Sequence, residues 1–110
     1  MKIISAPLNP EAMKRLDLDE CLPGDLEEFQ LSEEQYVQLS QSGVIEKINP
    51  SLGKLIDEYE DESIQGQAEL STLLNILSDA AEHTKLDSIE KIIYLNRLAL
   101  HNKTGLFFYF

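Results

Sequence analysis

Residues Gln67 to Lys103, QAELSTLLNILSDAAEHTKLDSIEKIIYLNRLALHNK, decide the fold of this chain. As far as His83, the apolar side chains recur at the i, i+3, i+4, i+7 spacing of an amphipathic helix. A second helical pattern then begins at Asp87, whose side chain can cap the first amides of that helix. We expect the two helices to form the core of the protein. Their predicted buried side chains include Leu73, Leu77, Ile92 and Leu95.

The second helical pattern has the wider apolar face, so we place that helix at the centre of the fold. Asn96 lies in the middle of this face, where a buried amide is expected to be hydrogen-bonded. Gly105 tolerates positive φ and is predicted to follow the end of the helix. The stretch Leu106–Phe110 is apolar on both of its alternating faces, which favours a short buried strand. An exposed tail that contacts a partner is the alternative.

Two stretches of the N-terminal half carry clear helix-start signals. Asn9 stands before Pro10, which places a good N-cap residue ahead of a proline at the first helical position. This pair predicts a short helix that ends near Asp17. The run Ser32–Gln35 has the form of a capping box and predicts a helix over Glu33–Ser42.

A third start signal, Asn49 before Pro50, predicts a helix that continues through the acidic run Asp57–Glu62. The apolar face of this helix would hold Leu52, Leu55, Ile56 and Tyr59. Core packing is therefore the expected role of Tyr59.

These elements predict a mainly helical α+β fold with about five helices in one domain, residues 1–110. A chain of this length can form a core without disulfides or metal. Short segments near both termini are expected to form one small sheet, and an all-helical bundle is the alternative. The three segments are Ile3–Ser5, Glu27–Gln30 and Leu106–Phe110.

The formal net charge of −11 is distributed very unevenly along the chain. Residues 1–62 contain 15 acidic and 5 basic side chains, whereas residues 63–110 contain 5 acidic and 4 basic ones. An anionic surface repels nucleic acid and anionic membranes, and it attracts basic proteins. We therefore expect a basic protein partner, no direct contact with nucleic acid and no membrane binding. Negative charge also favours solubility, which is the simpler explanation.

No pattern in the sequence is typical of an active site or a metal site. His83 and His101 are far apart, and no cysteine or further histidine stands at metal-ligand spacing from either one. The chain also lacks a phosphate-binding glycine loop and a nucleophile elbow. We predict that the protein is not an enzyme and needs no cofactor or metal.

Cys21 is the single cysteine, so the chain forms no internal disulfide and a cytoplasmic location is expected. Acidic neighbours should raise the pKa of its thiol, and we predict that it is a small buried hydrophobic residue. The apolar run at the N-terminus is too short for a signal peptide. No stretch approaches the roughly 20 apolar residues that span a bilayer.

In size, charge and helical content, the chain resembles the small acidic immunity proteins with which bacteria neutralise a cognate toxin, such as those of contact-dependent growth inhibition systems. The acidic side chains that carry this resemblance are concentrated in Leu16–Glu34 and Asp57–Glu62. It is a resemblance of overall type over the whole chain and assigns no role to a single residue. It implies a monomer that occludes the active site of a basic toxin, with a nuclease as the expected toxin class.

The predicted binding site for such a partner is the acidic run Asp57–Glu62. Like charges clustered on one helix are mildly destabilising, which gives a reason to expect a partner there. The predicted contact residues are Asp57, Glu58, Glu60, Asp61 and Glu62, followed by Glu33 and Glu34. Tyr36 or Tyr59 is a candidate aromatic anchor beside them. Two further functions stay open: an adaptor that binds another basic or helical partner, and a nucleic-acid mimic.

Overall fold

An antiparallel four-stranded sheet organises the computed structural model, which describes residues 1–110. The strands are β1 (Lys2–Pro7), β2 (Leu26–Leu31), β3 (Asp61–Gln65) and β4 (Gly105–Tyr109), in the spatial order β2-β1-β4-β3. The helices are α1 (Pro10–Asp17), α2 (Glu33–Gln41), α3 (Val44–Leu52), α4 (Gln67–His83) and α5 (Asp87–Asn102). The α+β class is therefore confirmed, and so are the three predicted strands.

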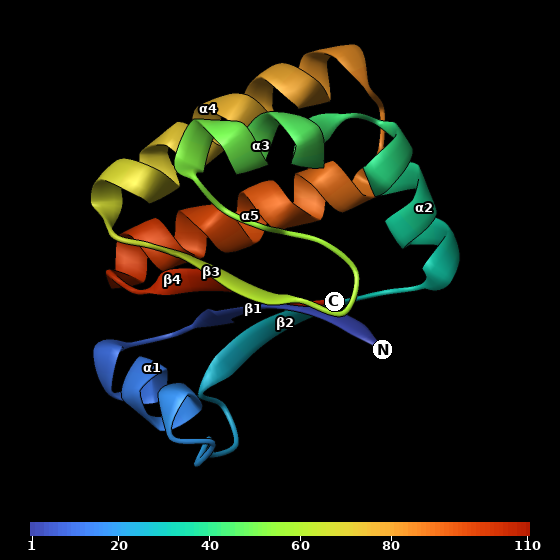
Figure 1. The fold of residues 1–110 in the computed structure, drawn as a ribbon. Helices are drawn as coiled ribbons and strands as arrows, with labels where there is room; N and C mark the ends of the chain where they lie inside the picture. Colours follow the sequence, from blue (N-terminus) through green and yellow to red (C-terminus); the bar gives the residue numbers. More distant parts are fainter.

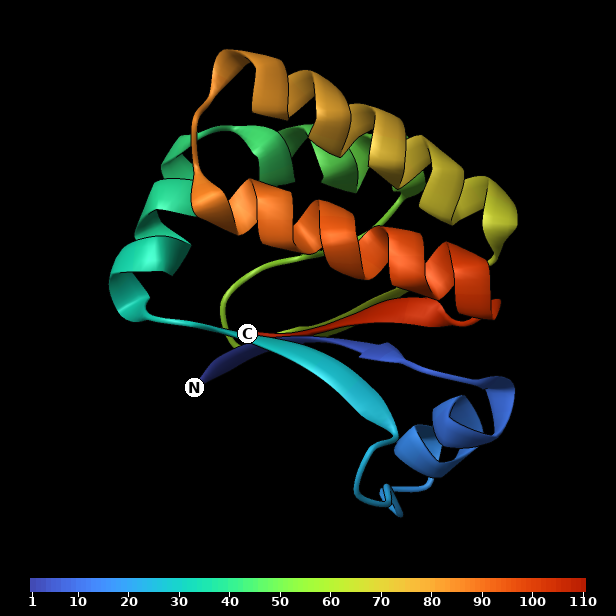
Figure 2. The same cartoon turned by 180° about the vertical axis from the view of Figure 1, so that it is seen from behind.

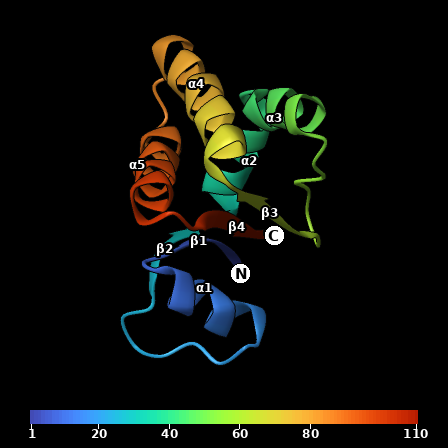
Figure 3. The same cartoon turned by 90° about the vertical axis from the view of Figure 1, so that its left-hand side faces the viewer.

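The helices are divided unequally between the two faces of the sheet. Helices α2, α3, α4 and α5 lie on one side, and α1 lies alone on the other (Figures 1 and 3). Helix α5 packs directly on β1, β2 and β4, and α4 packs on α5 and α3. Figure 2 shows α5 stretched along the sheet between the strands and α4. The prediction that α5 is the centre of the fold is confirmed. No helix has both the length and the apolar character of a membrane span.

The core lies between α5 and the sheet face beneath it. Leu73 and Leu77 of α4 and Ile92 and Leu95 of α5 are all buried, as predicted. Side chains of the strands complete the same cluster, because every second residue of a strand points to one face. The strand residues that contribute are Ile4, Ala6, Phe29, Leu31, Ile64, Leu106 and Phe108.

Two predicted helix starts form as the sequence indicates. The Asn9 side chain accepts a hydrogen bond from the Ala12 N–H at 2.8 Å, with Pro10 as the first residue of α1. At the start of α2, Ser32 Oγ accepts from the Gln35 N–H at 3.1 Å, and Gln35 Oε1 accepts from the Ser32 N–H at 2.8 Å. These caps satisfy amides that would otherwise lack a partner.

The predicted helix from Asn49 through Glu62 is wrong. Gly43 adopts positive φ (83°), so that α2 ends and α3 begins directly after it, and Pro50 lies inside α3. Asn49 does not cap a new helix. Its side chain instead accepts from the Ile56 N–H at 2.9 Å and donates to the Ile56 carbonyl at 3.1 Å, which fixes the chain reversal after α3.

The acidic run therefore lies in a loop and in the first two residues of strand β3 rather than on a helix. Asp61 stands opposite Tyr109 in the pairing of β3 with β4. Tyr59 is 88% exposed and is not part of the core. Strand β3 carries no clear sequence signal, because two of its five residues are Asp and Glu, which are depleted in strands.

The ends of α5 also differ from the prediction. Leu86 is the N-cap residue and no side chain caps the helix, so the expected role of Asp87 is wrong. Lys103, not Gly105, adopts the left-handed conformation after the helix (φ 57°). Gly105 is needed for a different reason: a Cβ atom there would lie 2.8 Å from Gln65 Cγ and 3.0 Å from the Ile64 carbonyl oxygen.

Asn96 is fully buried, and neither its amide nitrogen nor its oxygen has a hydrogen-bond partner in the protein. The prediction of a hydrogen-bonded core amide is therefore wrong. Leaving such a group unsatisfied costs about 1–3 kcal/mol, so Asn96 is a local defect in an otherwise apolar core.

Candidate functional site

The structure brings together most of the predicted contact residues at one end of the sheet, where both chain termini lie (Figure 1). We call this region the sheet end; it comprises Glu33 and Glu34 at the start of α2 together with residues 57–60. Lys2 Nζ lies 3.0 Å from Glu33 Oε1 and 3.0 Å from Glu58 Oε2. Residues that are 25 positions apart in the sequence thus meet around one lysine.

Lys2 itself is buried, with its Nζ 4.8 Å from the centre of the Tyr36 ring. Its hydrogen bonds to Glu33 and Glu58 raise the pKa of the ammonium group. Burial raises the pKa of the Tyr36 hydroxyl, and Asp57 and Glu58 raise it further. Two of the predicted contact residues, Glu33 and Glu58, therefore already serve an internal cation.

Two further acids of the run have structural partners in the main chain. Asp57 Oδ1 accepts from the Glu58 N–H at 2.8 Å. Glu62 accepts from the Leu55 N–H at 3.0 Å and from the Ser63 N–H at 2.9 Å, and these bonds lower the pKa of its carboxyl. Three predicted residues have no side-chain hydrogen bond or ion pair and are exposed: Glu34, Glu60 and Asp61.

Tyr59 stands among these acids and is the most exposed aromatic residue of the chain. Its φ of 65° lies in the left-handed region, which costs a residue with a side chain roughly 1–2 kcal/mol. Its exposure shows that core packing does not compensate this cost. Of the two predicted anchors, Tyr59 is free to contact a partner, whereas Tyr36 packs edge-on against Phe110 at a centroid distance of 5.2 Å.

The second candidate surface is the side of the sheet opposite α5, which we call the open face. Strand pairing places two rows of four residues side by side across this face, as the register requires. The first row reads Gln30, Ile3, Tyr109 and Asp61, and the second reads Glu28, Ser5, Phe107 and Ser63. Helix α1 covers the far end of the face only, away from the termini (Figures 1 and 2).

Acidic side chains surround the aromatic centre of the open face. Burial raises the pKa of the Tyr109 hydroxyl, and Asp61, Glu28 and Asp17 all raise it further. Shallow depressions flank Phe107 on both sides. One of about 180 Å³ lies between β3 and β4, and one of about 280 Å³ lies against α1, where Lys14 is the single cation.

Sequence reasoning found Asp61 but missed the rest of this face. Leu106–Phe110 was expected to be buried on both sides, yet Phe107 and Tyr109 are half-exposed. Both alternating faces of β4 are apolar, so the sequence does not reveal which one is covered. The acids Glu27 and Glu28 within a predicted strand were the available signal, because one of the two had to point away from the core.

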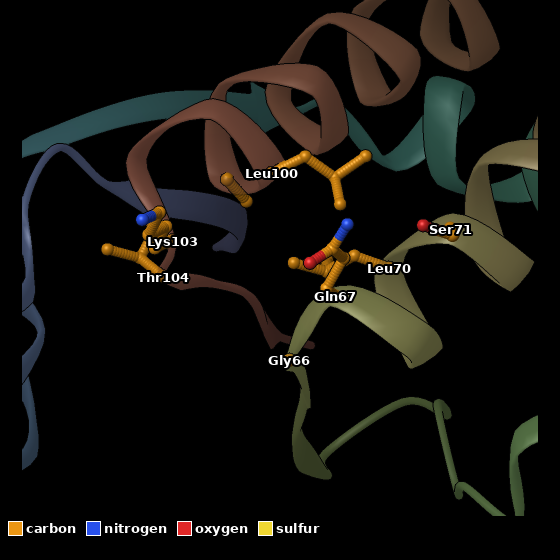
Figure 4. Close-up of a pocket in the computed structure, with 8 residues that line it drawn as sticks. Gly66, Gln67, Leu70, Ser71, Leu100, Lys103 and Thr104 are labelled. Carbon is orange, nitrogen blue, oxygen red and sulfur yellow. The ribbon is translucent and has the colours of Figure 1, made fainter.

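The largest cavity, of about 580 Å³, is far from both acidic surfaces. It lies between the start of α4 and the end of α5, and Figure 4 shows Gln67 on one side and Lys103 with Thr104 on the other. The Thr104 hydroxyl donates to the Pro7 carbonyl at 2.7 Å and is not free to react. The lining holds no carboxylate, cysteine or histidine, so no nucleophile and base are paired in it.

Residues with metal-binding or nucleophilic side chains are dispersed. No three His, Cys, Asp or Glu residues converge in a geometry that could hold a metal ion. His83 and His101 are exposed. Cys21 is also exposed, which contradicts the predicted burial, and loss of solvent around its sulfur together with Asp25 raises the pKa of the thiol. A thiol with a raised pKa is a weak nucleophile at neutral pH.

The two acidic surfaces, rather than a cavity, are therefore the best candidate for a functional site. Their carboxylates and exposed aromatic rings suit recognition of a cationic protein surface. Comparisons of the chain with protein-family models, curated proteins and solved structures give no match.

Proposed function

We propose that this protein is an acidic binding module for a basic protein, and specifically an immunity protein that occludes the active site of a toxin nuclease. The observation that carries the proposal is the exposed Tyr59 in a left-handed conformation beside unpaired acids of the sheet end. The exposed ring of Tyr59 contributes little packing, and residues with strained backbones cluster at functional sites. Aromatic anchors surrounded by charge are typical of interaction hot spots.

The charge distribution supports the same partner class. A nuclease needs a cationic cleft for phosphate groups, and a rigid array of carboxylates complements that cleft. Glu34, Glu60 and Asp61 have no internal partner, so binding would not require an existing ion pair to break. Opposite charges on two proteins accelerate their encounter and favour the correct partner.

This geometry changes which of the predicted contact residues we expect to matter most for binding the partner. Glu34, Glu60 and Asp61 become the first choice, together with Tyr59. Glu33 and Glu58 are partly neutralised by Lys2, and Asp57 and Glu62 hold main-chain amides. Repulsion between like charges on a helix gives no reason to expect a partner here, because the run is not helical.

The test is co-expression of the chain with the polypeptide encoded immediately upstream of its gene, followed by purification on a tag placed on that polypeptide. We expect a one-to-one complex, loss of the nuclease activity of the upstream product, and protection of the producing cells. A complex with an upstream product that has no toxic activity would favour the adaptor function. Failure of the two polypeptides to bind would reject the immunity function.

A matched pair of double variants tests the surface. Glu60→Lys with Asp61→Lys should slow association strongly and abolish protection, because two unpaired acids become cations. Asp79→Lys with Glu82→Lys makes the same change on the exposed side of α4 and should have little effect. Equal effects of the two double variants would show that only the net charge matters.

A further inference from the structure

The centre of the open face carries apolar side chains that are only partly covered. In an antiparallel sheet with one wet face, the residues on that face are usually polar. Here Ile3, Phe107 and Tyr109 occupy three of the four central positions and are half-buried. Helix α1 covers only the end of the face that lies away from the chain termini (Figure 2).

An acidic residue lies on each side of this apolar centre, one on β3 and one on β2. Asp61 is directly opposite Tyr109, a position in which Cβ atoms lie about 4.5–5.5 Å apart. On the other side, Ser5 is buried and its hydroxyl donates to Glu28 Oε2 at 3.3 Å, which keeps that carboxylate over the face. The face therefore presents an aromatic floor with an acid on each side, Glu28 held by Ser5 and Asp61 without a partner.

From this arrangement we infer that the open face is the docking surface for an arginine-bearing surface of a basic protein. A guanidinium group is planar, stacks on aromatic rings and pairs with carboxylates at its edge. Tyr109 and Phe107 supply the rings, and Asp61 and Glu28 supply the carboxylates. The inference rests on the proposed function in that the partner is basic; it adds where that partner binds and which side chain it presents.

Charge excludes a second copy of this chain as the occupant. The protein carries a net charge of −11, and the acids around Tyr109 would face the same acids across a symmetric dimer. A neutral peptide would cover the rings but leave the acids Asp61 and Glu28 without partners. A cationic, arginine-rich surface satisfies both the rings and the acids.

The experiment is an NMR titration of the ¹⁵N-labelled protein with a hexa-arginine peptide at low ionic strength. The largest amide shift changes are expected at Ile3, Phe107 and Tyr109. A hexa-lysine peptide of equal charge should bind about three- to tenfold more weakly, because an ammonium group does not stack on the rings.

Three variants make the assignment decisive. Tyr109→Ser removes the ring, and Asp61→Asn with Glu28→Gln removes the charge without shortening the side chains. Either change should weaken hexa-arginine binding by at least about fivefold. The matched control, Asp79→Asn with Glu82→Gln, removes the same charge from α4 and should change binding less than twofold. Preserved amide spectra would verify that each variant is folded.

The possible failures are distinguishable. If hexa-arginine shifts the amides around Glu34 and Glu60 and the face variants bind normally, the docking surface is the sheet end: this inference fails and the proposed function stands. If neither peptide binds at low salt, this inference fails, and the co-expression test alone decides the proposed function. Concentration-dependent dimerisation that is lost in Tyr109→Ser would assign the face to a second copy and overturn the inference.

Discussion

The two faces of the sheet are built from alternate residues of the same strands, yet they differ in what covers them. Under α5, Ile4, Leu106 and Phe108 are buried, whereas on the open face Phe107 and Tyr109 are half-exposed. Along β4 the open face holds two aromatic residues, Phe107 and Tyr109, and the covered face holds one, Phe108. The difference teaches that hydrophobicity within a strand does not separate residues that hold the fold from residues that are free to bind. The elements packed above the strand make that separation.

The largest expected effect tests this difference directly. Phe108→Ala should reduce the free energy of unfolding by about 3–5 kcal/mol, because it empties a filled core position. Phe107→Ala, one residue away on the open face, should cost less than about 2 kcal/mol, because its ring is only partly removed from water. Urea unfolding of the two variants provides the measurement. Equal losses of unfolding free energy would show that Phe107 is packed as tightly in solution as Phe108. The two faces would then not differ in how they are covered.

On the covered face, a substitution of Asn96 is expected to increase stability rather than reduce it. Asn96→Leu should raise the free energy of unfolding by about 1–3 kcal/mol, since both buried polar atoms lack partners and an apolar side chain removes that penalty. Asn96→Ala is the control for added volume. The urea midpoint of each variant decides the result, and a loss of stability in both would mean that the amide makes an essential hydrogen bond.

The hold of α1 on the open face depends on pH through Asp25. Arg15 Nε and Nη2 donate to this buried carboxylate at 2.8 and 2.7 Å, and the Leu22 N–H donates to it at 2.8 Å. Chiefly because of Arg15, the pKa of Asp25 falls from 3.8 to about 2. Between those pH values the unfolded chain binds a proton that the folded protein does not.

The stabilisation from Asp25 should therefore be complete above about pH 4 and should disappear as the pH falls towards 2. The measurement is the difference in unfolding free energy between the wild type and Asp25→Asn, taken from pH 7 down to pH 2. The difference should be constant at the upper end and shrink below pH 4. A difference that does not change with pH would exclude ionisation of Asp25 as its source.

The smallest expected effect concerns Tyr59. Tyr59→Asn should raise the free energy of unfolding by up to about 1 kcal/mol, because asparagine tolerates the left-handed conformation and the tyrosine ring contributes little packing. The same variant should weaken binding to the partner. Higher stability together with weaker binding in Tyr59→Asn would show that this residue serves binding and not folding. Lower stability would mean that the tyrosine ring is packed in solution.

The parts of the fold that could be predicted are those fixed by local patterns. The apolar spacing of α4 and α5, the Asn9 cap and the Ser32 capping box each depend on neighbours within one or two helical turns. The predicted helix from Asn49 through Glu62 does not form, because an asparagine before a proline is compatible with two different structures. A cap before a proline predicted a helix start, but the amide bonds to Ile56, seven residues away, instead.

The candidate site was predictable in composition and not in geometry. The clustering of acids along the sequence pointed to residues 57–62 and to Glu33 and Glu34. In the structure, Glu58 and Glu33 lie on either side of Lys2, so these two groups of acids share one surface. Whether an acid is available to a partner depends on Lys2, which pairs with Glu33 and Glu58. No pattern in the sequence indicates that this lysine is buried between β1, the start of α2 and the loop before β3. The open face depends on strand register, because Asp61, Tyr109, Ile3 and Gln30 become neighbours only through three separate strand pairings.

The central position of β1 and β4 has a consequence for the order of events during synthesis. The first strand of the chain pairs with the last one, Ile3 with Tyr109 and Ser5 with Phe107. While the ribosome is still adding α5, β1 can pair with β2 alone, and both the core and the row that contains Tyr109 and Asp61 are incomplete. Contacts between such distant residues also slow folding, since a long loop must close before they form. The part of the open face that contains Tyr109 therefore cannot form until β4 has left the ribosome.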